Sequence, residues 1–173
     1  MGKHAEALKQ YDQAKALNVE LKQEKSLSGI LITISMGTYH SRAKKDYDKA
    51  LGCMEEAERL AKAISYDKTK FFAGTLMSKG DVFWNMKSLT KALECNQRGL
   101  AILKEIKQDR TDLASVILQC VGGILVDKKQ PKEAIEPLEL CQEIRRELHL
   151  ENSSDYKAVA GLLQKLRNAG AGQ

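Results

Sequence analysis

The chain has 173 residues, of which 43% are hydrophobic and 29% are charged, values typical of a globular protein that exclude a disordered chain. Aromatic residues make up only 5% and there are two prolines, which argues against a β-sandwich. The net charge of +5 is modest and basic residues alternate with acidic ones, so nucleic-acid binding is not favoured.

An internal repeat runs along the whole sequence. Four similar segments share alanines whose positions differ by 43, 42 and 42 residues: Ala7, Ala50, Ala92 and Ala134. A small residue follows seven positions after each: Ala14, Ala57, Gly99 and Cys141. An aliphatic residue follows ten positions after each: Leu17, Leu60, Ile102 and Ile144. These offsets lie on one face of an α-helix, so each segment is predicted to be an amphipathic helix. The small residues are expected where a neighbouring helix approaches closely, and Gly99 in particular is expected to lie where two helices touch.

A second set of helices is predicted between these segments. Ser or Thr residues, whose side chains cap the exposed N–H groups of a helix start, stand before each: Ser26, Thr69, Thr111, and Ser153 or Ser154. The helices that follow are predicted over residues 27–43, 70–86, 112–127 and 155–167. The sequence therefore predicts one all-α domain over 1–173, with about eight helices and no strand. Its repeat pieces are 1–25, 26–66, 67–108 and 109–150, followed by a C-terminal helix over 151–168.

The repeat resembles the tetratricopeptide family. In residues 79–102, Gly80, Phe83, Ala92 and Gly99 occupy the positions of that motif. The next repeat is similar through Gly122, Leu125, Ala134 and Cys141, and the preceding one has Thr38 in place of the glycine, with Tyr47, Ala50 and Ala57. The step of about 42 exceeds the usual 34, which is similar to the longer repeats of kinesin light chains. HEAT-like repeats share this period and are the structural alternative.

The resemblance implies a right-handed solenoid of antiparallel helix pairs, in which the first helix of each pair lines a concave groove. A step of 42 then predicts these groove residues: Ser35, Tyr39, Arg42, Met77, Asp81, Trp84, Gln119, Gly123 and Val126. Trp84, the one tryptophan, is the expected anchor for a bound peptide. The alternative is that Trp84 and Tyr39 pack against the next repeat. Neither the carboxylate clamp of chaperone-binding members nor the Asn pair of kinesin light chains is present.

A module that binds another protein or peptide, a scaffold or adaptor, is therefore the predicted function. The alternative is a structural subunit of a cytoskeletal or ciliary assembly that binds through its convex or end surfaces. No nucleophile, carboxylate pair or phosphate loop favours an enzyme, and no cofactor is expected. The four cysteines (Cys53, Cys95, Cys120 and Cys141) lack metal-ligand spacing, so reduced thiols in a cytoplasmic protein without a membrane segment are expected.

Two local expectations concern the ends of elements. Pro137 lacks the N–H that would bond to the carbonyl of Glu133, so it is expected to begin or bend its helix. The first element, residues 4–25, matches the second helix of the later pairs, which suggests that the chain begins in the middle of a repeat. Ala7, Tyr11 and Ala14 would then lack a packing partner, and self-association through this uncovered helix would cover them.

Overall fold

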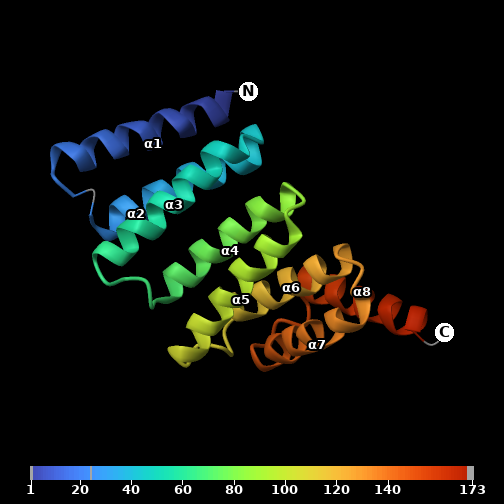
Figure 1. Ribbon diagram of the computed structural model, residues 1–173. Helices are drawn as coiled ribbons and strands as arrows, with labels where there is room; N and C mark the ends of the chain where they lie inside the picture. The colour runs from blue at the N-terminus through green and yellow to red at the C-terminus, as the bar shows by residue number, and fades with distance from the viewer. Residues whose placement is uncertain (1, 24, 171–173) are drawn as a thin grey trace.

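The structure, a computed structural model, describes residues 2–23 and 25–170. Over these ranges it contains eight α-helices, one π-helical turn and no strand, so the all-α prediction is confirmed. Figure 1 shows the helices following one another along an elongated array, with α1 and α8 at opposite ends. In chain order the elements are α1 (Gly2–Glu20), α2 (Leu27–Tyr39), η1 (His40–Lys44), α3 (Tyr47–Ala63), α4 (Lys70–Asn85), α5 (Leu89–Glu105), α6 (Asp112–Asp127), α7 (Pro131–Glu147) and α8 (Ser154–Gly170).

The predicted helix starts are confirmed by their caps. The hydroxyls of Ser26, Thr69 and Thr111 accept hydrogen bonds from backbone N–H groups three residues on, and Ser153 does the same before α8. Pro131 is the first residue of α7, where a missing N–H costs little. Pro137 lies inside α7, so the expectation that it begins its helix is wrong.

The helices pair as α2 with α3, α4 with α5, and α6 with α7 around a continuous apolar core. Each pair has a glycine of its first helix in the interface, where an added Cβ atom would lie 2.9, 2.4 or 2.5 Å from a side-chain atom of the second helix: Gly37, Gly80 and Gly122. The glycine of the first pair is thus Gly37, which corrects the expectation that Thr38 replaces it. Close approach at these positions fixes how tightly the two helices of a pair pack.

The turns between helices contain left-handed residues that the sequence pattern does not predict. Seven described residues after helix ends adopt the left-handed conformation, and none of them is glycine: Lys22, Lys45, Ser65, Lys87, Lys107, Lys129 and His149. After α6, for example, the N–H of Lys129 donates to Val126 and the N–H of Gln130 donates to Leu125, the bonds of a Schellman motif. Glycine is the usual residue at this position because a Cβ atom is strained there.

We therefore expect Lys129→Gly to raise the free energy of unfolding by about 0.5–1 kcal/mol, since it relieves strain that exceeds the entropic cost of glycine. Lys165→Gly is the control, because Lys165 is exposed in the middle of α8. This change removes the same charge but should lower stability by about 1 kcal/mol. Urea unfolding measures both, and equal signs for the two variants would contradict the role given to the turn.

The first pair is one residue longer than the others. The distance from the helix cap to the left-handed residue is 19 residues from Ser26 to Lys45, but 18 from Thr69 to Lys87 and from Thr111 to Lys129. The extra residue is accommodated by the π-helical turn η1, where the N–H of Lys45 donates to the carbonyl of His40, five residues earlier. The repeat step is therefore 43 residues before η1 and 42 after it.

The outer face of α1 is more exposed than the matching faces of the other second helices. Leu17 is 53% exposed, whereas the equivalent Leu60, Ile102 and Ile144 are 4%, 8% and 0% exposed. Tyr11 and Ala14 are half-buried, and the side chain of Ala7 lies outside the described residues. The expectation that this helix has an uncovered apolar face agrees with these values.

Candidate functional site

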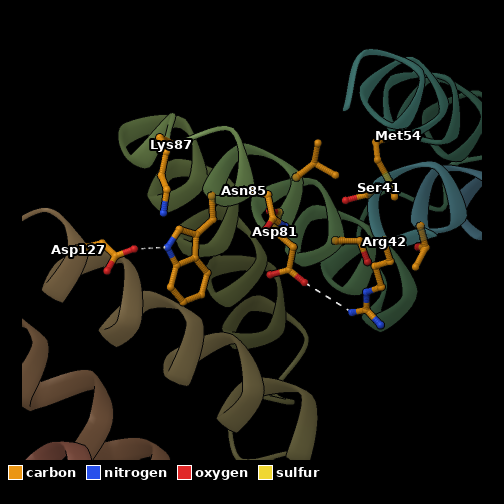
Figure 2. A pocket seen from close by; sticks show the side chains of 11 residues that line it. Ser41, Arg42, Met54, Asp81, Asn85, Lys87 and Asp127 are labelled. Carbon is orange, nitrogen blue, oxygen red and sulfur yellow. Dashed lines mark hydrogen bonds and ion pairs between the residues drawn. The ribbon is translucent and has the colours of Figure 1, made fainter. Parts of the chain in front are cut away.

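A pocket of about 480 Å³ lies where the ends of three successive first helices come together. We call it the Trp84 pocket, and Figure 2 shows it from close by. Its walls come from the end of α2 and η1, from α4 and the turn after it, from the last residue of α6, and from Met54 of α3. The lining residues are Thr38, Ser41, Arg42, Met54, Ser78, Asp81, Val82, Trp84, Asn85, Lys87 and Asp127.

Trp84 joins two repeats at this pocket. Its indole N–H donates a 2.8 Å hydrogen bond to the carboxylate of Asp127, drawn as the dashed line that ends at Asp127 in Figure 2. Its ring lies over Gly123, where a Cβ atom would come within 2.5 Å of the indole. The side chain is half-buried. Trp84 therefore packs against the next repeat, which is the alternative given in the sequence analysis, and it also lines the pocket.

Asp81 and Arg42 form the charged part of the pocket. Their closest nitrogen and oxygen atoms are 3.9 Å apart, and Figure 2 shows the two side chains extending towards each other from α4 and η1. The thiol of Cys120 lies 3.8 Å from the Asp81 carboxylate and is placed to donate to it. Burial raises the pKa of Asp81 above its usual value, and the charge of Arg42 offsets this only in part.

Asp81→Asn is expected to stabilise the protein at neutral pH by up to about 1 kcal/mol. Folding raises the pKa of Asp81, so the ionised carboxylate lowers the stability of the fold at pH values above that pKa. Below the ordinary carboxyl pKa range the side chain is protonated in both the folded and the unfolded chain, and this penalty is absent. The gain should therefore disappear near about pH 3. Thermal unfolding across pH measures it, with Asp12→Asn on the exposed surface of α1 as the control. A variant less stable than wild type at neutral pH would refute this interpretation.

The structure brings only some of the predicted groove residues together. Arg42, Asp81 and Trp84 line the Trp84 pocket. Ser35 and Tyr39 lie with Arg42 along a shallower depression near Tyr11. Met77 and Val126 are partly buried against the core, and the side-chain amide oxygen of Gln119 accepts a hydrogen bond from the buried Arg145.

The repeat step of 42 puts Tyr39 in the wrong register. Tyr39 is buried, with 8% of its surface exposed. Its true equivalents Val82 and Ile124 are buried too, with 1% and 0% exposed. The step of 43 residues before η1 makes Thr38, not Tyr39, the counterpart of Asp81, and Ser41 the counterpart of Trp84. Thr38 and Ser41 indeed line the pocket.

Several residues that line the pocket do not follow from the step of 42, and only some of them could have been found from the sequence. The distances from the caps to the helix ends could have located Thr38 and Ser41. Asp127 and Lys87 follow from no pattern in the sequence, because one depends on the reach of Trp84 across two repeats and the other on a left-handed turn without glycine.

The described residues contain no group of three or more His, Cys, Asp or Glu side chains that could hold a metal ion. Burial raises the pKa of all four cysteine thiols, and that of Cys120 reaches about 12, which makes these thiols poor nucleophiles. None of the described helices has the length and apolar character needed to cross a bilayer.

The stacked antiparallel helix pairs form a helical-repeat solenoid with a tetratricopeptide-like fold. No family model and no curated protein sequence matches the chain. Among solved structures it is similar to BtubC (BKLC) from P. vanneervenii, with 17% identity and a TM-score of 0.87 over 98% of this chain and 67% of that one. It is also similar to a kinesin light chain protein from Podosopora anserina with nearly identical TPR-like repeats, with 13% identity and a TM-score of 0.78 over 99% and 81% of the two chains. The predicted fold is thus confirmed.

Proposed function

We propose that this protein is a non-enzymatic scaffold that binds a peptide segment of a partner protein in the Trp84 pocket. The observation on which the proposal rests is the composition of the pocket. An aromatic ring, two carboxylates and two cations from three successive repeats line one cavity: Trp84, Asp81, Asp127, Arg42 and Lys87. Pockets with an aromatic wall and a few polar groups are suited to side chains of a bound segment.

Asp81 adds a second argument. Its burial opposes ionisation, so a carboxylate at this position makes the fold less stable at neutral pH. Residues that lower stability are concentrated where proteins bind ligands. Asp81 and Arg42 together would select the charges of the bound segment, and the Trp84 ring would supply most of the contact area.

A selection from a random-peptide library, followed by Trp84 fluorescence, tests the proposal. Because Trp84 is the one tryptophan of the chain, its emission reports on the pocket directly. Selected peptides should change this emission on binding. Ser78→Phe, which places a ring inside the pocket, should weaken the same peptides at least tenfold, whereas Gln97→Phe on the exposed surface of α5 should not. Thermal midpoints show whether both variants remain folded. Peptides that bind both variants as they bind wild type would refute the proposal.

The exposed face of α1 favours a second candidate, association with other subunits through this end of the array. Three apolar side chains at the end of α1 and in the turn after it are about half exposed: Leu17 (53%), Val19 (52%) and Leu21 (53%). Sedimentation equilibrium of wild type and of Leu17→Lys would separate the two. If wild type associates as its concentration rises and Leu17→Lys does not, the second candidate is supported. If wild type stays monomeric at all concentrations, self-association through this end is excluded.

A further inference from the structure

The turns of the solenoid lie along two opposite edges. Figure 1 shows the turns after α2, α4 and α6 along one edge, and the turns after α3 and α5 along the other. We call the first one the basic edge and define it as residues 42–49, 85–91 and 127–133. The opposite edge consists of residues 20–23, 25, 62–70, 104–112 and 146–155.

The net charge of the chain is unevenly divided between these edges. The basic edge contains nine basic and four acidic residues, and the opposite edge contains nine basic and eight acidic residues. The excess on the basic edge therefore equals the net charge of +5 of the whole chain. Its cations are exposed except Lys128, which is half-buried: Arg42, Lys44, Lys45, Lys49, Lys87, Lys91, Lys128, Lys129 and Lys132.

Ion pairs neutralise only part of the cations on either edge. On the opposite edge, Lys68 binds Glu105, and Arg110 binds Glu143 and Glu147. Six lysines of that edge have no ion pair with any described residue: Lys22, Lys25, Lys62, Lys70, Lys104 and Lys107. On the basic edge, Lys49 pairs only with its neighbour Asp46, and Lys91 lies over the Phe83 ring. Six lysines there have no ion pair with any described residue: Lys44, Lys45, Lys87, Lys128, Lys129 and Lys132.

Three of these lysines occupy strained turn positions. Lys45, Lys87 and Lys129 have φ angles of 54°, 61° and 63°, and they follow one another at steps of 42 residues. They therefore recur once per repeat along the edge. The edge is continuous with the Trp84 pocket, because Arg42 and Lys87 belong to both.

We propose that the basic edge binds an acidic segment of the partner protein, next to the part that enters the Trp84 pocket. This inference rests on the proposed function. Unpaired ammonium groups at regular spacing attract a run of carboxylates and raise the rate of association. A protein segment fits better than nucleic acid, because Asp48, Asp127 and Glu133 lie on the same edge and repel a continuous line of phosphates.

The left-handed turns allow a test in which folding is preserved. The edge variant is Lys45→Gly/Lys87→Gly/Lys129→Gly, which removes three charges at positions where glycine is favoured. The control variant is Lys22→Gly/Lys107→Gly/Lys25→Gln, which removes three charges from the opposite edge and changes two turns of the same conformation. Thermal midpoints at or above that of wild type establish that both are folded.

The probe is a fluorescein-labelled oligoglutamate peptide, followed by anisotropy at low and moderate salt. We expect it to bind wild type with an affinity that falls as salt rises, to bind the edge variant roughly tenfold more weakly, and to bind the control variant within about twofold of wild type. Equal binding to the edge and control variants would overturn the proposal. So would tighter binding of an oligothymidine of equal charge, which would indicate a nucleic-acid surface.

The same samples distinguish this proposal from the proposed function. If library-selected peptides still require an open pocket, and are weakened by Ser78→Phe, while oligoglutamate does not distinguish the two edges, the edge proposal alone fails. If neither probe responds to its variant, both proposals fail.

Discussion

Glu58→Ala is expected to lower the free energy of unfolding by about 3 kcal/mol, because it leaves a partly buried cation unpaired. Glu58 of α3 is only 9% exposed and binds Lys79 of α4 at 2.7 Å and Arg98 of α5 at 3.3 Å. The Lys79 side chain is itself 15% exposed, so water cannot replace the lost carboxylate fully. Urea unfolding measures the change. Glu56→Ala is the control, because Glu56 lies two residues before Glu58 and its ion pair with Arg59 is exposed. It should lower the free energy of unfolding by less than about 1 kcal/mol.

The next repeat shows how the same three positions are filled without charge. The equivalents of Glu58, Lys79 and Arg98 at a step of 42 are Leu100, Val121 and Leu140, which belong to or pack against the apolar core. The variant Glu58→Leu/Lys79→Val/Arg98→Leu should therefore come within about 1 kcal/mol of wild type or exceed it, since apolar replacement of a whole buried ion network is often neutral or stabilising. A triple variant as unstable as Glu58→Ala would show that the network stabilises the fold as a unit.

Gly99→Leu is expected to lower the free energy of unfolding by about 1–3 kcal/mol through overpacking. A Cβ atom at Gly99 of α5 would lie 3.2 Å from the carbonyl oxygen of Ala73 in α4 and 3.4 Å from Ile117 in α6. The first of these neighbours is backbone and cannot move aside readily. The prediction that Gly99 lies where helices touch is confirmed by these contacts.

Gly52→Leu is the matched control, because Gly52 of α3 has no atom within 4 Å of its added Cβ position. It should raise stability by up to about 1 kcal/mol through helix propensity. The two substitutions therefore differ in sign, and thermal unfolding decides between them. A Gly99→Leu protein with an unchanged or raised midpoint would contradict the packing argument.

The fold could be predicted because its determinants are local and repeated. The columns at Ala50, Ala92 and Ala134 record a helix face that must be apolar in every repeat, and these three alanines are 0% exposed. The caps Ser26, Thr69 and Thr111 satisfy N–H groups within three residues, so they too can be found from sequence. The ends of the helices are harder to predict from the sequence, because Lys45, Lys87 and Lys129 stand at left-handed positions where a glycine would have indicated the helix end.

The candidate site was predicted only in part, because it depends on a single inserted residue. The extra residue in η1 makes the step to the next repeat 43 for the residues of α2, so Tyr39 matches the buried Val82, and Thr38 matches Asp81 and lines the pocket. The hydrogen bond from Trp84 to Asp127 joins residues 43 positions apart. The position that is the apolar Leu100 in one repeat is Glu58 in the preceding repeat, where it forms an ion network. Contacts of this kind are specific to one repeat, so a pattern averaged over repeats cannot show them.

Hydrogen–deuterium exchange of the protein with and without a library-selected peptide tests the central claim most directly. Binding in the Trp84 pocket should slow exchange at the amides of 38–42, 78–87 and 124–127, the segments that contribute its walls. The amides of α1 should exchange at the same rate in both samples. Slower exchange confined to α1, or spread over the second helices α3, α5 and α7 with none at the pocket, would contradict the account and favour association through the end or outer surfaces.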